Sequence, residues 1–210
     1  MPQKVIGVLV SGSGSNLQAV IDAIEAGRIG GRIAVVISDR PGAYALERAK
    51  KHGIDTVCLD RKTMDARALN AAIRDRLGKE GVDLVVLAGF LSILDAETVG
   101  QYKNAMLNIH PSLIPSFCGP GFHGRHVHEA AIAYGVKLSG ATVHFVDEGT
   151  DTGPIVLQQS VPVLSGDDPD TLAARVLKAE HALLPEAVRL FVNGQIQVDG
   201  RKVTIRENSN

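Results

Sequence analysis

Asn108 and His110 stand two residues apart at the end of an apolar run, in the stretch NIHPSLIPSF. An imidazole can accept or donate a proton near neutral pH, and a carboxamide can donate to a carbonyl oxygen that gains negative charge. Because residues two apart on a strand point to the same side, both groups would face one carbonyl. This pattern is suited to acyl transfer, in which a tetrahedral intermediate is stabilised and protons move.

A histidine in this role usually needs a carboxylate to orient it and raise its pKa. The loop DEGTDTG, residues 147–153, offers Asp147, Glu148 and Asp151, and the residues alone do not choose among them. A structural histidine, hydrogen-bonded at a strand end, is the competing interpretation of His110. The nearby asparagine, the two prolines of the PSLIP loop and the acidic loop together favour catalysis.

A Gly/Ser turn, SGSGSN at residues 11–16, lies between the first expected strand and the first expected helix. Glycines permit tight turns, and the amides of a helix N-terminus, with Ser15 and Asn16 nearby, form a natural anion site. The turn lacks the GK[ST] of a nucleotide P-loop, and Leu17 stands where GxGxxG has its third glycine. The pattern favours one phosphate on a small molecule, and a tight turn with a helix cap is the alternative.

Apolar, β-branched runs alternate with stretches of helical period, which predicts an α/β, Rossmann-like fold with a mainly parallel twisted sheet and helices on both faces. The run at residues 83–90 is the most uniformly apolar and indicates a central strand. A long loop, residues 111–125, separates this part from a half that is expected to contain antiparallel strands. A long helix with Pro185 inside it, a weak pair of strands and a polar tail close the chain.

Composition and charge exclude several classes of protein. The 210 residues are 45% hydrophobic and 21% charged, which is ordinary for a soluble domain with a sizeable core. A net charge of −1 gives no electrostatic basis for binding nucleic acid or an anionic membrane. The first apolar run is too short for a signal sequence and no run of about 20 apolar residues occurs, so a cytoplasmic location is expected. Cys58 and Cys118 have no spacing typical of disulfide frameworks or zinc sites.

Three stretches, NIHPSLIPSF, SGATVHFVDEGTDTGPIVLQ and SGSGSNLQA, together closely resemble the folate-dependent formyltransferase family over about residues 4–193. HPSLIPSF is shared across its transferases and hydrolases, and the SGSGSN turn is similar to members that formylate phosphoribosylglycinamide. The resemblance implies transfer of a formyl group from 10-formyltetrahydrofolate to phosphoribosylglycinamide in de novo purine biosynthesis, by a monomer or homodimer without metal. It also implies one domain, residues 1–210, with a phosphate-binding half (about 1–100), a catalytic and folate-binding half (about 101–195) and a tail (196–210).

Site residues are implied by the same resemblance. His110 is similar to the family's catalytic acid/base, Asn108 to the residue that polarises the formyl carbonyl, and Asp151 to the carboxylate that holds the histidine. The ribonucleotide site is implied at Gly14, Ser15, Asn16 and Glu180. The folate site is implied at Arg67, Leu91, Ser92, Ile93, Leu94, Asn108, Asp147, Glu148, Gly149, Thr150 and Asp151. Ser92 stands where many members have an arginine.

Direct transfer is the expected mechanism: protonated His110 and Asn108 stabilise the oxyanion, and Asp151 keeps the imidazole charged. The nearest rival is a formyltetrahydrofolate hydrolase, which usually carries an N-terminal regulatory domain, whereas this chain begins at its first strand. Sugar and tRNA formyltransferases carry a further acceptor-binding domain. A catalytically silent phosphate-binding module would leave the Asn, His and Asp set unexplained.

Two further groups of reactive side chains have simpler interpretations. His123, His126 and His128 are offset by three and five residues, which does not place all three on one helical face, so a solvated helix start is favoured over a metal site. Cys118 has no evident activating base nearby in the sequence, which disfavours a nucleophile.

Overall fold

The structure is a computed structural model that describes residues 3–206. The chain divides into two compact units, an N-terminal unit (residues 1–108) and a C-terminal unit (residues 109–210). The end of the expected polar tail, residues 207–210, and residues 1–2 lie outside the described residues. The assignment of one functional domain to residues 1–210 stays a prediction.

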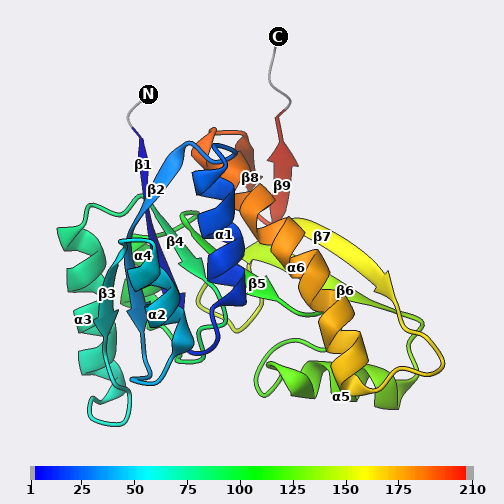
Figure 1. Cartoon of the computed structure of the whole chain (residues 1–210). Coiled ribbons are helices and arrows are strands. Elements are labelled where there is room, and N and C mark those ends of the chain that lie inside the picture. Colours follow the sequence, from blue (N-terminus) through cyan, green and yellow to red (C-terminus); the bar gives the residue numbers. More distant parts are fainter. Residues whose placement is uncertain (1–2, 207–210) are drawn as a thin grey trace. The chain divides into compact units, whose positions relative to one another are not determined.

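Parallel strands form the sheet of the N-terminal unit, in the order β3-β2-β1-β4-β5 (Figure 1). They are β1 (Lys4–Val10), β2 (Gly31–Ser38), β3 (Asp55–Cys58), β4 (Leu84–Leu87) and β5 (Met106–His110), whose last two residues belong to the C-terminal unit. The chain first builds outward from β1 through β2 and β3, and then continues with β4 on the other side of β1. The strand order therefore reverses between β1 and β4, and ligands of open α/β sheets usually bind at such a point.

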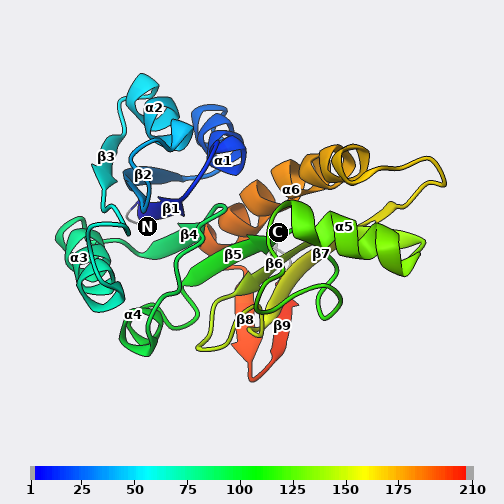
Figure 2. The same cartoon turned by 90° about the horizontal axis from the view of Figure 1, so that it is seen from below.

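Four helices cover both faces of this sheet: α1 (Ser15–Glu25), α2 (Tyr44–Lys51), α3 (Ala66–Lys79) and α4 (Ala96–Gln101). Figure 2 shows α1 and α2 on one face and α3 and α4 on the other. All four residues of β4 are buried, as expected for a central strand with both faces covered. The strand is shorter than expected, because the chain leaves the sheet after Leu87 and turns at Gly89, whose φ is +74°.

The C-terminal unit contains α5 (Arg125–Tyr134), β6 (Leu138–Phe145), β7 (Ile155–Pro162), α6 (Pro169–Val192), β8 (Ile196–Asp199) and β9 (Lys202–Ile205). β6 and β7 are antiparallel, and so are β8 and β9. α6 packs on β6, on β7 and against α5, and it continues through the buried Pro185. An Asp168–Thr171 capping box and Pro169 in the first turn fix where α6 begins.

The α/β class expected from the sequence, with a mainly parallel sheet and antiparallel strands in the C-terminal half, is confirmed. The weak pair of strands near the C-terminus forms as the β8–β9 hairpin. Within residues 3–206, none of the helices combines the length and the apolar character that crossing a membrane requires.

Candidate active site

His110 ends β5 with a buried side chain, and both of its ring nitrogens face oxygen atoms. Nδ1 lies 3.4 Å from Oδ2 of Asp151, and Nε2 lies 2.9 Å from the carbonyl oxygen of Phe117. A carbonyl oxygen can only accept, so Nε2 carries the hydrogen and Nδ1 is left as the basic atom of the neutral ring. Of the three carboxylates in the acidic loop, Asp151 is the one placed against His110.

Asp151 is shared between two histidines and a backbone amide. Its Oδ1 lies 3.6 Å from Nε2 of His144, and its Oδ2 accepts a hydrogen bond of 3.0 Å from the amide of Gly119. Its φ of +57° lies in the left-handed region, which Asp tolerates better than most residues. His144, at the end of β6, is buried, and sequence reasoning missed it. The available signal was a lone titratable residue in an apolar strand just before the acidic loop.

Burial sets the direction in which the pKa of His110 moves. Burial lowers the pKa of His110 below its ordinary value, and nearby His144 lowers it too, although Asp151 and the Phe117 carbonyl act in the opposite direction. For Asp151, burial raises the pKa, but the hydrogen bond from His144, the charge of His110 and the Gly119 amide together bring it below its ordinary value. Asp151 is therefore charged at neutral pH and His110 is mainly neutral. Burial thus acts against the expected charged imidazole, which Asp151 and the Phe117 carbonyl favour.

The loop after His110 is fixed by side chains of β6 and β7. Thr142 donates to the carbonyl of Ser112 at 2.6 Å and accepts from the amide of Ile114 at 3.1 Å. Gln158 donates to the carbonyl of Ile114 at 3.0 Å and to the hydroxyl of Thr142 at 3.0 Å. The two prolines alone do not hold this loop, since its backbone groups are bound on both sides of Leu113.

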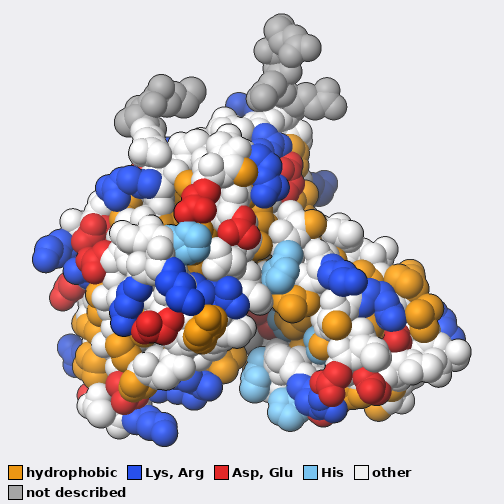
Figure 3. Space-filling view, in the orientation of Figure 1, with side chains coloured by type: hydrophobic (Ala, Val, Ile, Leu, Met, Phe, Trp, Pro, Cys, Tyr) orange, Lys and Arg blue, Asp and Glu red, His pale blue; other side chains and the backbone are white. Residues whose placement is uncertain are grey.

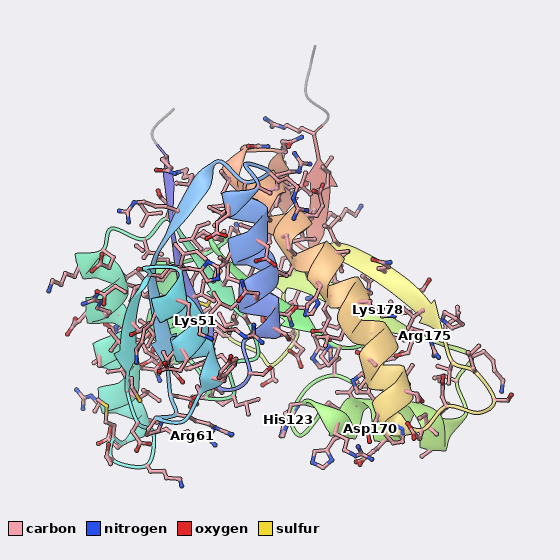
Figure 4. The ribbon with its side chains drawn as sticks, in the orientation of Figure 1. Lys51, Arg61, His123, Asp170, Arg175 and Lys178 are labelled. Carbon is pink, nitrogen blue, oxygen red and sulfur yellow. The ribbon has the colours of Figure 1, made fainter. Side chains whose placement is uncertain are left out.

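The SGSGSN turn leads into α1 with Gly14 at the N-cap, where φ is 73° and no side chain caps the first turn. Ala45 of α2 donates its amide to the carbonyl of Gly12 at 3.1 Å, and Arg48 donates to the carbonyl of Ser13 at 2.9 Å. Figure 3 shows Lys and Arg side chains gathered over α2, whose Lys51 is labelled in Figure 4. The positive end of the α1 dipole and these cations favour an anion at the turn.

The Leu91–Leu94 segment follows β4 and lies beside this turn. The amide of Ser11 donates to the carbonyl of Gly89 at 3.1 Å, and the amide of Leu91 donates to the hydroxyl of Ser11 at 2.8 Å. The structure thus brings together the expected phosphate turn and the first expected folate segment where the strand order reverses. Leu91 is 38% exposed and Ile93 is 72% exposed, so this loop presents apolar side chains to solvent.

The remaining candidate residues occupy varied settings. Asp147 accepts from the amide of Gly149 at 3.2 Å and from the hydroxyl of Thr152 at 2.6 Å, so it closes the acidic loop on itself. Glu180 is buried in α6, and Asn108 is half-buried in β5. The exposed ones are Arg67 in the first turn of α3, and Glu148, Gly149 and Thr150 in the acidic loop. Their roles stay predictions.

The histidines and the cysteine near α5 differ in burial. His128 is buried, whereas His126 is exposed and pairs with Glu129 at 3.1 Å. No group of three or more His, Cys, Asp or Glu side chains that could hold a metal occurs within residues 3–206. Burial and the charge of Asp151 both raise the pKa of the Cys118 thiol, which keeps it protonated and weakly nucleophilic.

Comparisons with known proteins find a family match over most of the chain. Residues 4–188 match the formyl transferase family. The chain is 41% identical over 194 residues to the phosphoribosylglycinamide formyltransferase of Escherichia coli (strain K12), covering 92% of this chain and 89% of that protein. It is 44% identical over 195 residues to the trifunctional purine biosynthetic protein adenosine-3 of Drosophila melanogaster, covering 91% of this chain but spanning only 14% of that protein's length.

Two solved structures are similar to the whole chain. The crystal structure of glycinamide ribonucleotide transformylase 1 from Symbiobacterium toebii matches with a TM-score of 0.92 and 48% identity, covering 98% of this chain and 95% of that one. A formyltetrahydrofolate deformylase from Pseudomonas syringae matches with a TM-score of 0.90 but 26% identity, covering 98% of this chain and 66% of that one.

Proposed function

The chain belongs to the formyl transferase family, and on that premise we propose that it transfers the formyl group of 10-formyltetrahydrofolate to the amine of phosphoribosylglycinamide. The products are phosphoribosyl-N-formylglycinamide and tetrahydrofolate, in purine biosynthesis in the cytoplasm. The observation that carries the proposal is the buried pair of His110 and Asp151, 3.4 Å apart, at the end of a strand whose Asn108 stands two residues earlier.

The proposed reaction makes one bond to the formyl carbon and breaks another. The substrate amine attacks that carbon, and Asn108 donates to the oxygen as it becomes negative. Neutral His110 accepts the proton that the amine loses, at Nδ1, where Asp151 stabilises the resulting charge. The bond from carbon to the folate nitrogen then breaks, and His110 returns the proton to that nitrogen. No covalent enzyme intermediate and no metal take part.

Two parts of the N-terminal unit are suited to bind the proposed substrates. The turn at Gly14, Ser15 and Asn16, with Arg48 on its Ser13 carbonyl, is suited to the phosphate group. Leu91 and Ile93 offer apolar side chains for the flat ring of the folate, and we place the rest of the folate site at Ser92, Leu94, Arg67 and residues 147–151. We assign Glu180 to the ribose hydroxyls.

Release of tetrahydrofolate from 10-formyltetrahydrofolate, measured with and without phosphoribosylglycinamide, tests the proposal. We expect release that depends strictly on the acceptor, and a loss of about 100- to 10,000-fold in kcat for His110→Ala, because general acid–base catalysis contributes about that much. His126→Ala changes an exposed histidine of the same unit and should retain full activity. Near-normal turnover in His110→Ala would contradict the assignment of His110 as the residue that accepts and returns the proton. Release without acceptor would instead identify a deformylase, the second candidate, which the similar structure from Pseudomonas syringae favours.

A further inference from the structure

Asp39 is a buried carboxylate directly after β2 that the proposed chemistry does not use. Its side chain has no exposed surface. Oδ2 accepts a hydrogen bond of 2.6 Å from the hydroxyl of Ser92 and lies 3.6 Å from a guanidinium nitrogen of Arg61. Oδ1 has no hydrogen-bond partner within the part of the chain that the structure describes.

The charge of so deeply buried a carboxylate is stabilised by only a few hydrogen-bond donors and cations, so each of them matters. Burying a charged group is costly unless it is paired, and hydrogen bonds to charged groups are shorter and stronger than neutral ones. Arg61, labelled in Figure 4, is one-third exposed and beyond hydrogen-bond distance, so it supplies only a partly screened charge. The Ser92 hydroxyl is therefore the main direct hydrogen-bond partner of the Asp39 side chain. The same bond fixes the position of the Ser92 side chain.

Ser92 lies between the two exposed apolar residues of the loop after β4. The amide of Leu91 is bound to Ser11, and the carbonyl of Ile93 accepts from the buried Asn70 at 3.2 Å. With Ser92 held inward by Asp39, its neighbours Leu91 and Ile93 are the side chains left facing solvent. The short bond at Ser92 thus fixes the chain between these two exposed apolar side chains.

We propose that Asp39, acting through the Ser92 hydroxyl, is a positioning residue that presents Leu91 and Ile93 to the flat heteroaromatic ring of the folate. The proposal rests on the proposed function, since it assigns that ring to this loop. It accounts for the serine at position 92, because a hydroxyl reaches the buried carboxylate with a short bond and leaves no charge at the surface.

Titration with tetrahydrofolate, together with separate KM values for the two substrates, tests this role in the full chain. Ser92→Ala removes the donor and leaves Asp39 without it, so we expect the Kd for tetrahydrofolate and the KM for 10-formyltetrahydrofolate to rise about 10-fold. The KM for phosphoribosylglycinamide should stay within about two-fold. Ser92→Thr keeps the hydroxyl and should restore folate binding, which a merely structural loss of packing would not predict.

Asp39→Asn provides a second variant, because its carbonyl oxygen still accepts from Ser92 while the charge is lost. We expect a smaller rise in the Kd for tetrahydrofolate than in Ser92→Ala. Wild-type affinity in Ser92→Ala, or an equal rise of both KM values, would overturn the positioning role while leaving the proposed function intact. A wild-type chain that binds tetrahydrofolate but shows no acceptor-dependent turnover would refute only the proposed function, and one that fails to bind it would refute both.

Discussion

Replacing Gly14 by alanine should displace the SGSGSN turn and weaken its hold on a phosphate. An added Cβ would lie 2.6 Å from the Cβ and 2.7 Å from the Cα of Ala45. Carbon atoms normally approach to about 3.5 Å, so the shortfall (3.5 minus 2.6) is about 0.9 Å. Ala45 is fully buried and hydrogen-bonded to Gly12, so the turn must give way. A misplacement of about 1 Å costs about 100-fold in rate.

Steady-state kinetics with phosphoribosylglycinamide varied would measure this loss, and we expect kcat/KM to fall about 100-fold. Gly27→Ala is the matched control, because Gly27 also has a left-handed φ, +69°, but an added Cβ meets nothing within 4 Å. Left-handed backbone costs a non-glycine residue about 1–2 kcal/mol in both variants. Gly14→Ala should lose more stability to thermal unfolding than Gly27→Ala, because only its added Cβ clashes with Ala45. The reasoning would be refuted by Gly14→Ala with wild-type kcat/KM, or by an equal kinetic loss in Gly27→Ala.

Two further predictions concern charge in the C-terminal unit. In Asp151→Asn the side-chain oxygen can still accept from the Gly119 amide, but the lost charge no longer raises the pKa of His110. We therefore expect kcat to fall about 100- to 10,000-fold and the acid limb of the pH–rate profile to move to lower pH. An acid limb that does not move would contradict the pairing of Asp151 with His110. Burial lowers the pKa of His128 below 6.5, so the unfolded chain binds more protons than the folded one below that pH. The contribution of His128 to the free energy of unfolding is therefore fully present above pH 6.5 and falls as the pH drops, by up to about 1.4 kcal/mol per pH unit. Thermal unfolding of His128→Gln should show a shallower loss of stability over the same pH range.

Local patterns of sequence were enough to predict most of the fold. The uniformly apolar run at residues 83–90 identified β4 as a covered strand, because only a strand with helices on both faces buries all of its side chains. Its end at Leu87 was not predictable from hydrophobicity, since Ala88 is also buried and the turn depends on Gly89. The weak alternation near the C-terminus was sufficient because Gly200 and Arg201 form a two-residue turn between β8 and β9.

Contacts across long stretches of sequence were less predictable. Asp39 and Ser92 are 53 residues apart, and no local pattern links a residue after β2 with one after β4. A charged residue directly after a buried strand was the available signal for Asp39. The direction of the pKa of His110 also required the structure, because it depends on how completely the ring is buried and on His144, neither of which a spacing of residues specifies.

The contacts of Asp151 explain how a buried neutral histidine can still accept and return a proton. His110 turns Nε2 toward the carbonyl oxygen of Phe117, so Nδ1, which lies 3.4 Å from Asp151, is the basic atom of its neutral ring. A proton that arrives at Nδ1 of His110 therefore replaces a repulsive contact with Asp151 by an attractive one. Asp151 thus favours the charged ring that has accepted the proton in the proposed transfer, while burial favours the neutral ring that has returned it.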